Sequence, residues 1–275
     1  MPKVTGWGAT RTNTNRRLPE TGAARFELSG KVKTNVREAS DVAALPNGAF
    51  AIVGDRSDRI TLVDKNGKAK EIELPGLKNG KSQLEGVAFD PVRQHLFVAR
   101  EESGELLRYE WDPSSGKTPK LEKTFELPKN ETKNKGVEGL SYLPEALSPT
   151  GKPQLLLANE GKPRRLSLLD DGGGGKPLEV KLEREVFAVC RDFSAVAVDP
   201  RTGNVFLSSD ESATVAQVKL VRDGDVVRGQ LVQSFPLRTG KDKALERVEG
   251  LAFNDKGDLF VLTENDGDLR ALSRK

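Results

Sequence analysis

The chain has 275 residues, 36% of them hydrophobic and 31% charged, and its 44 Lys and Arg against 41 Asp and Glu give a net charge of +3. This length can enclose one large core, and no stretch approaches the roughly 18 to 20 consecutive apolar residues that would cross a membrane. Acidic and basic residues are scattered together along the chain. The composition therefore excludes a transmembrane protein and argues against nucleic-acid binding.

The first part of the chain is predicted to be irregular over residues 1–24. Thr12 to Arg17 and Pro19 to Gly22 are rich in polar and turn-forming residues. Met1 to Lys3 leads into polar residues and not into the apolar core of a signal peptide, so no leader is expected in this sequence.

A repeated pattern of strands follows. Five segments share a polar or acidic residue, a small residue and an apolar-rich strand, and they begin at Ser40, Glu85, Glu138, Ser194 and Glu249, with spacings of 45, 53, 56 and 55 residues. In each repeat, turn residues lead to a second and a third strand, and four repeats continue into a fourth. Four strands in about 45 to 55 residues, without long amphipathic helices, are typical of a β-propeller blade.

The fifth repeat ends near its third strand, Leu269 to Ser273, and lacks a fourth. Residues 25–32 resemble the fourth strand of the second repeat, Lys123 to Pro128, and can supply the missing one. Such a strand would close the ring and cover an exposed sheet edge. The sequence thus predicts an all-β fold: a five-bladed β-propeller with four-stranded antiparallel blades, whose last blade is closed by an N-terminal strand, as one domain over residues 25–275.

The chain has one cysteine and one histidine, and both limit the chemistry it can carry. Cys190 has no second cysteine with which to form an internal disulfide, so cysteine usage does not indicate an oxidising or a reducing compartment. It precedes an inner strand and is expected to be buried and inert. His95 excludes zinc sites built from several histidines and is interpreted as a turn residue that enters a strand. A metal, if bound, would have oxygen ligands, which calcium and magnesium prefer.

Acidic residues recur at one end of every predicted blade. The first strand of a blade lines the central channel, so its first residue faces its counterparts from the other blades. Where that residue is Ser40 or Ser194, an acid stands two positions earlier, Glu38 or Asp192. A second acidic column follows the second strands, at Asp55, Glu101, Glu160, Asp210 with Glu211, and Glu264. Because first and second strands run antiparallel, both columns should meet at one channel mouth.

These acids have two interpretations. Surface carboxylates usually pair with arginines, here Arg37, Arg56, Arg100, Arg191 and Arg247. Several carboxylates that converge on one axis, however, repel one another and raise their pKa values, so a cation or an arginine cluster must balance them. Calcium, which takes six to eight oxygen ligands, suits such a ring. The sequence therefore favours a divalent cation in the channel and leaves the arginine alternative open.

Three stretches resemble the SdiA-regulated family of bacterial proteins. They are Arg191–Asp199 followed by Val205–Ser212, Val248–Asn254 followed by Leu259–Asn265, and Glu85–Asp90 followed by Val98–Glu101. The resemblance covers roughly residues 35–272. It implies an NHL-like five-bladed propeller, generally outside the cytoplasm, that binds calcium at its shared acidic site. The implied calcium-site residues in this sequence are Glu85, Glu138, Asp192, Glu249 and Glu264, with Glu38, Glu101, Glu160 and Glu211 close by.

Three functional hypotheses follow. The first is a calcium-binding, non-enzymatic binding or scaffold module, periplasmic or secreted, with a small molecule or a protein as partner at the channel mouth; it is favoured because no nucleophile–base pair is recognised. The second is a calcium-dependent hydrolase, of lactonase, esterase or phytase-like type, that uses the same site. The third is an NHL-type platform for protein interactions on the opposite face. A monomer is expected, and a cytoplasmic location stays open.

Overall fold

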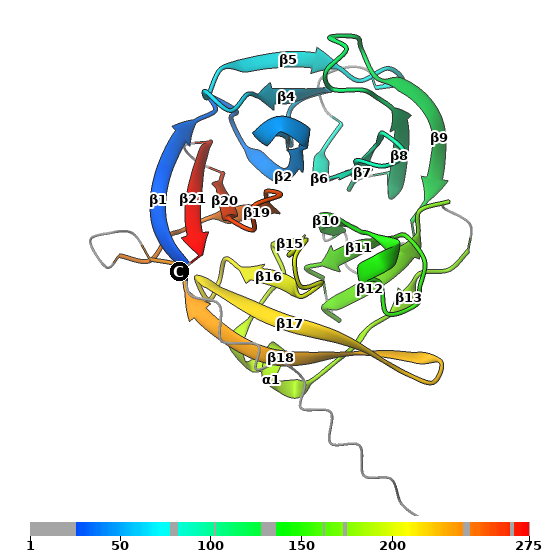
Figure 1. The fold of residues 1–275 in the computed structure, drawn as a ribbon, viewed down its shortest axis with the longest axis vertical. Coiled ribbons are helices and arrows are strands. Elements are labelled where there is room, and N and C mark those ends of the chain that lie inside the picture. The colour runs from blue at the N-terminus through cyan, green and yellow to red at the C-terminus, as the bar shows by residue number, and fades with distance from the viewer. Residues whose placement is uncertain are drawn as a thin grey trace, which may run out of the picture.

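The computed structural model describes residues 26–77, 82–101, 103–127, 136–161, 163–172, 175–238, 243–264 and 267–274. Five antiparallel sheets stand in a ring around a central channel, as a five-bladed β-propeller (Figure 1). The predicted fold class is therefore confirmed. The segment predicted to be irregular, residues 1–24, lies outside the described residues.

Each blade begins at the channel with its first strand and continues outward (Figure 1). The first blade comprises β2 (Ala39–Leu45), β3 (Ala49–Gly54), β4 (Arg59–Val63) and β5 (Ala69–Glu73). The second comprises β6 (Leu84–Asp90), β7 (His95–Arg100), β8 (Glu105–Glu110) and β9 (Lys120–Glu126). The third comprises β10 (Val137–Leu143), β11 (Gln154–Asn159), β12 (Arg165–Asp170) and β13 (Leu178–Glu179).

The fourth blade comprises β15 (Ala195–Val198), β16 (Val205–Ser209), β17 (Thr214–Asp223) and β18 (Val226–Pro236), with β14 (Lys181–Leu182) added at its outer edge. The fifth comprises β19 (Val248–Phe253), β20 (Leu259–Thr263), β21 (Asp268–Arg274) and β1 (Phe26–Lys33). The helical elements are short: the 3-10 turns η1 (Pro46–Gly48) and η2 (Glu145–Leu147) and the helix α1 (Arg184–Val189). None of the described helices is long and apolar enough to span a membrane.

The N-terminal strand closes the last blade, as predicted. β1 pairs antiparallel with β21, from Phe26 opposite Arg274 to Lys33 opposite Asp268, and Figure 1 shows the two strands side by side. Asp268 is fully buried and forms ion pairs with Lys31 and, at 3.1 Å, with Arg270. Beyond the ladder, the Thr34 N–H donates to the Gly267 carbonyl at 3.0 Å. The first and last described parts of the chain are thus joined in one sheet.

One predicted strand is divided between two blades. The sequence predicts a single fourth strand at residues 178–182, but β13 pairs with β12 of the third blade whereas β14 runs parallel to β18 of the fourth. Val180 between them is buried in the core shared by both blades. Burial of this one side chain turns the strand across the interface, and α1, which the sequence analysis did not predict, then packs Val186 into the same core.

The hydrophobic core lies between neighbouring blades, because each sheet buries both faces against the next. Cys190 is fully buried there, as predicted, and burial raises the pKa of its thiol to about 12. His95 is the first residue of β7, and its Nε2 lies 3.4 Å from the Glu122 Oε2. The contacts of Cys190 and His95 are therefore those of residues with a structural role.

Candidate functional site

Carboxylates gather at one mouth of the channel. A cavity of about 280 Å³ opens there, and ten of the residues that line it are Asp or Glu. They are Glu38, Asp55, Glu85, Glu138, Glu160, Asp192, Asp210, Glu211, Glu249 and Glu264. Eight of the nine site residues expected from the resemblance are in this set. The ninth, Glu101, lies outside the lining, where its Oε1 accepts a hydrogen bond from the Gly136 N–H at 3.1 Å.

β-bulges place the innermost acids. The pairing of the first with the second strand shifts by one residue in four blades, at Ser40, Glu85, Glu138 and Glu249. A bulged residue leaves the regular ladder, which re-aims its side chain. Three glutamates therefore turn toward the cavity from β6, β10 and β19. This local geometry explains why the first residue of these repeats faces the cavity.

A steric constraint explains why a small residue follows each glutamate. A Cβ atom on Gly139 would lie 2.8 Å from the Ala195 Cα of the next blade, closer than real Cβ contacts allow. Neighbouring inner strands therefore approach each other at this level, and a side chain there must point along the channel or be absent. The acid–glycine pair of the repeat thus combines a bulged carboxylate with close packing of the blades.

The three bulged glutamates hold their protons more tightly than usual. Burial, followed by repulsion from neighbouring acids, raises the pKa of Glu85 to about 7, of Glu138 to about 9 and of Glu249 to about 8. No Lys or Arg of the described residues lies within ion-pair distance of these three carboxylates. At neutral pH the inner part of the cavity therefore carries protons, or it carries a cation that replaces them.

Among the described residues, arginines form ion pairs with two acids at the rim of the cavity. The Arg56 Nε lies 2.6 Å from the Glu38 Oε2, and the Arg247 Nη1 lies 2.5 Å from the Glu264 Oε2. Arg100 instead pairs with Glu105, at 2.6 Å. The arginine interpretation is therefore right for Glu38 and Glu264 and does not account for the inner glutamates.

Two further acids are held in place by hydrogen bonds. Asp192 accepts from the Ser209 hydroxyl and, at 3.3 Å, from the Glu211 N–H. The Asp210 Oδ1 accepts from the Arg247 N–H at 2.5 Å and from the Val248 N–H at 3.3 Å, across the boundary between the fourth and fifth blades. These bonds fix the orientation of two carboxylates before any ligand arrives.

Asp41 is a buried channel residue that the sequence analysis did not single out. It is fully buried, its Oδ1 accepts from the Val42 N–H at 2.8 Å, and its Oδ2 accepts from the Val87 N–H at 3.0 Å and the Leu140 N–H at 3.1 Å. Burial raises the pKa of Asp41 well above its usual range. One carboxyl group thus links three blades across the channel.

The signal that could have revealed Asp41 is its place in the repeat. It occupies the position that is Gly86, Gly139, Ala195 and Gly250 in the other blades. Residues before it, such as Ser40, line the acidic cavity, whereas the next residue, Val42, lines a separate apolar cavity. Asp41 therefore separates the two halves of the channel.

Replacing Asp41 by Ala should lower the free energy of unfolding by about 2 to 4 kcal/mol, because the buried N–H groups of Val87 and Leu140 lose their acceptor. Asp41→Asn keeps one acceptor oxygen and should lose less. Urea denaturation of the three proteins measures the difference. An Asp41→Ala protein as stable as the original chain would show that these bonds do not hold the blades together.

The donor set of the acidic cavity fits calcium in its chemistry. All its polar side chains offer oxygen, and calcium accepts six to eight oxygen ligands in flexible geometry. Over the described ranges, no group of three or more His, Cys, Asp or Glu side chains is close enough to hold an ion as it stands. An ion would therefore have to draw the flexible glutamate side chains together, and their raised pKa values make protons its competitors.

Comparisons with known proteins agree with the fold. The model of a family described as SdiA-regulated matches residues 103–266. The PQQ-bound aldose sugar dehydrogenase of Streptomyces coelicolor is 15% identical with a TM-score of 0.56, over 92% of this chain and 99% of that one. An oxidoreductase of Thermus thermophilus, described as a glucose dehydrogenase, is 15% identical with a TM-score of 0.54, over 91% and 100%.

A structural-genomics protein of unknown function from Bacteroides thetaiotaomicron is 12% identical with a TM-score of 0.53, over 91% of this chain and 72% of that one. At these identities the likeness concerns the propeller fold alone. The chemistry of the channel mouth has to be argued from its own residues.

Proposed function

The chain belongs to the SdiA-regulated family, and we propose that its acidic channel mouth binds calcium, as part of a non-enzymatic binding or scaffold module outside the cytoplasm. The observation that carries this proposal is the group of three half-buried glutamates, Glu85, Glu138 and Glu249, with no described cationic side chain in ion-pair distance. Their raised pKa values mean that the charged form of the three carboxylates is disfavoured, and a divalent cation would stabilise that form.

Calcium is favoured over magnesium because of the shape of the donor set. The carboxylates come from five blades around a wide cavity of about 280 Å³. Magnesium demands near-octahedral geometry at short distances and keeps several waters, whereas calcium tolerates a larger and less regular ring of oxygens. Glu85, Glu138 and Glu249 would hold the ion from the channel side, and Asp192 and Asp210 from the rim.

The expected affinity supports a location outside the cytoplasm. Protons must leave the glutamates before calcium binds, and the side chains must rearrange, so both steps weaken binding. Extracellular calcium modules work with dissociation constants of about 10⁻⁴ to 10⁻³ M, which only a calcium-rich compartment saturates. A calcium ion bound at the mouth would leave ligand positions for an anionic group of a small molecule or protein, which is the partner chemistry proposed here.

Calcium should raise the melting temperature, and a chelator should lower it. At 100 times the dissociation constant the gain is about 2.7 kcal/mol, or about 5 to 10 °C for a domain of this size. Glu85→Gln and Glu249→Gln should reduce the gain, because each removes a carboxylate ligand. Glu71→Gln, on the outer strand β5, is the matched control and should leave the response unchanged. Thermal unfolding followed by circular dichroism measures all four proteins.

Two results would contradict the proposal. A melting temperature that does not respond to calcium in any of the proteins would leave the acidic mouth without a cation. Hydrolysis of lactones, esters or phosphate esters that depends on calcium and disappears in Glu249→Gln would instead establish the hydrolase alternative, with calcium polarising the scissile group.

A further inference from the structure

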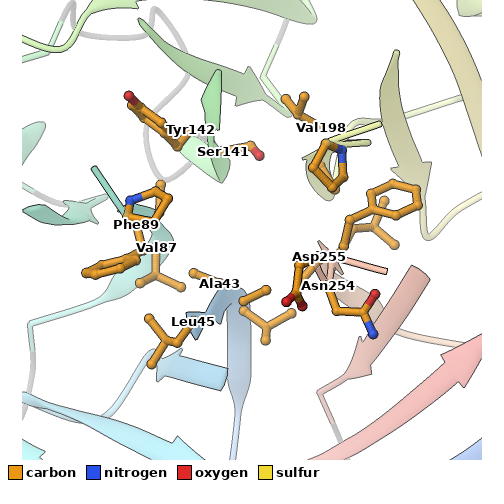
Figure 2. A pocket seen from close by; sticks show the side chains of 18 of the residues that line it. Ala43, Leu45, Val87, Phe89, Ser141, Tyr142, Val198, Asn254 and Asp255 are labelled. Atoms are coloured by element: carbon orange, nitrogen blue, oxygen red, sulfur yellow. The ribbon is translucent and has the colours of Figure 1, made fainter. Parts of the chain in front are cut away.

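A second cavity, of about 360 Å³, opens at the opposite mouth of the channel and is mainly apolar (Figure 2). It is lined by the later residues of the same five inner strands whose first residues line the acidic mouth. Asp41, with its bonds to the Val87 and Leu140 N–H groups, lies between the two cavities. The two mouths are therefore chemically distinct and separate.

The lining follows the repeat in tiers. The fourth position of each repeat, counted from Ser40, Glu85, Glu138, Ser194 and Glu249, carries a small residue, namely Ala43, Ala88, Ser141, Ala197 and Ala252. Small side chains keep the centre of the cavity open. The next position carries Ala44, Phe89, Tyr142, Val198 and Phe253, which form apolar walls nearer to the mouth. The cavity is thus a consequence of a regular choice of residue size in all five blades.

The outermost tier breaks the symmetry. Four blades end their inner strand with Pro46, Pro91, Pro144 and Pro200, whereas the fifth has Asp255 at the equivalent position. Prolines give a rigid apolar rim that loses little entropy when a ligand binds. Of the described residues that line this cavity, Asp255 is the one that carries a charge. A single acid therefore stands in a ring of prolines.

The contacts of the described residues indicate no structural role for the Asp255 carboxylate. No described Lys or Arg forms an ion pair with it, and the side chain is exposed. Its neighbour Asn254 is occupied locally: the Asn254 Oδ1 accepts from the N–H groups of Lys256 and Asp258, and its Nδ2 donates to the Asp258 Oδ2. Asp255 is therefore free to bind a group of a ligand at the mouth.

The opposite side of the mouth carries charges that compensate one another. Figure 2 shows Tyr142 across the cavity from Asp255. The Arg93 Nη1 lies 3.5 Å from the Tyr142 hydroxyl and forms ion pairs with Asp90 and Asp171. Two carboxylates balance Arg93, so among the described residues of this mouth the carboxylate that no cation compensates is that of Asp255. A cationic group on a ligand is therefore favoured at Asp255, which gives the mouth one preferred orientation.

We propose that this mouth binds a small amphiphilic cation, which places an apolar ring system between the blades and an ammonium group at Asp255. An engineered apolar cavity of about 150 Å³ holds benzene, so a cavity of this size has room for two fused rings. The apolar walls supply the larger part of the affinity, and Asp255 selects the charge. This site does not depend on the calcium proposed for the other mouth.

Tryptamine tests the proposal, because it joins an indole ring to a primary ammonium group. Tryptophol, with a hydroxyl in place of the ammonium, and indole-3-propionate, with a carboxylate, are matched probes. Isothermal titration calorimetry on the full chain should show tryptamine binding about two- to fivefold more tightly than tryptophol, as a partly exposed ion pair provides. Indole-3-propionate should bind most weakly.

Variants assign the binding to this mouth. Asp255→Asn should reduce the affinity for tryptamine to that for tryptophol, whose own affinity stays unchanged, and Asp255→Pro, which restores the residue of the other blades, should do the same. Ala44→Phe should weaken all three probes. Because two other blades have Phe89 and Phe253 at that position, the fold accommodates an aromatic ring there.

Three results would overturn the proposal. Equal affinity of the original chain for the three probes would show that Asp255 does not contribute to binding. The absence of saturable binding up to about 10 mM tryptamine would show that the cavity does not bind such a cation. Loss of tryptamine binding in Glu85→Gln with Glu249→Gln, but not in Asp255→Asn, would place the cation at the acidic mouth instead. Failure of the calcium proposal leaves these expectations unchanged.

Discussion

Removal of residues 1–33, which deletes β1, should abolish cooperative unfolding or lower the melting temperature by about 10 °C or more. β1 provides the outer strand of the last blade, and its continuation past Thr34 leads directly into β2 of the first blade. The deletion exposes the edge of β21, leaves buried Asp268 without Lys31, and removes the covalent link between the fifth and first blades. The ring is stabilised by contacts between neighbouring blades, and the shortened protein keeps only three described strands, β19 to β21, in its fifth blade.

Two controls make this result specific. Removal of residues 1–20, a segment that the sequence predicts to be irregular, should change the melting temperature very little. A synthetic peptide of residues 24–35 should restore part of the stability of the shortened protein, because a strand can add to an open sheet edge in trans. Calorimetry on all three preparations provides the comparison. Equal tolerance of both deletions would mean that closure by β1 contributes little to stability.

The stability of the protein without divalent cations should fall as the pH rises from about 5 to about 9. Glu85, Glu138 and Glu249 have pKa values raised to about 7, 9 and 8 from the ordinary 4.5. In this window the folded state keeps protons that the unfolded chain has released. Because the folded state binds more protons, the free energy of unfolding decreases with pH, with the loss complete above the folded pKa values. The expected decrease is about 3 kcal/mol or more.

Calcium and one substitution should change this pH dependence in defined ways. Glu249→Gln removes one titrating group and should raise the stability of the metal-free protein at pH 9 by about 1 to 3 kcal/mol. Saturating calcium should abolish most of the decline, because the ion replaces the protons. Asp64 and Asp112, whose pKa values are lowered, complete their titration below the window and do not mask the effect. Asp41, whose pKa burial raises, adds to the decline with the same sign. Urea denaturation from pH 5 to 9 measures the free energy of unfolding. A free energy that stays constant or rises with pH would show that the three glutamates are ordinary surface acids.

Short-range patterns in the sequence were sufficient for the blades and for the acidic mouth. Each blade is built from strands that follow one another along the chain, so alternation of apolar residues and turn chemistry indicated the strands, and the repeat indicated the ring. The acidic columns could be placed at one mouth because first and second strands of a blade run antiparallel. The missing fourth strand of the last repeat likewise predicted closure by β1, which pairs with β21.

Contacts between blades were decided only by the tertiary structure. Asp41 bonds to Val87 and Leu140, which are 46 and 99 residues away in the sequence, and no local pattern specifies such distances. The turn of residues 178–182 from the third to the fourth blade depends on burial of Val180 between them. The packing of five similar blades around one axis likewise decides which acids pair with an arginine and which do not. It also decides the place of Asp255 in a ring of prolines. A repeat in the sequence determines what each blade contributes to the channel, whereas burial and charge arise only where the blades meet.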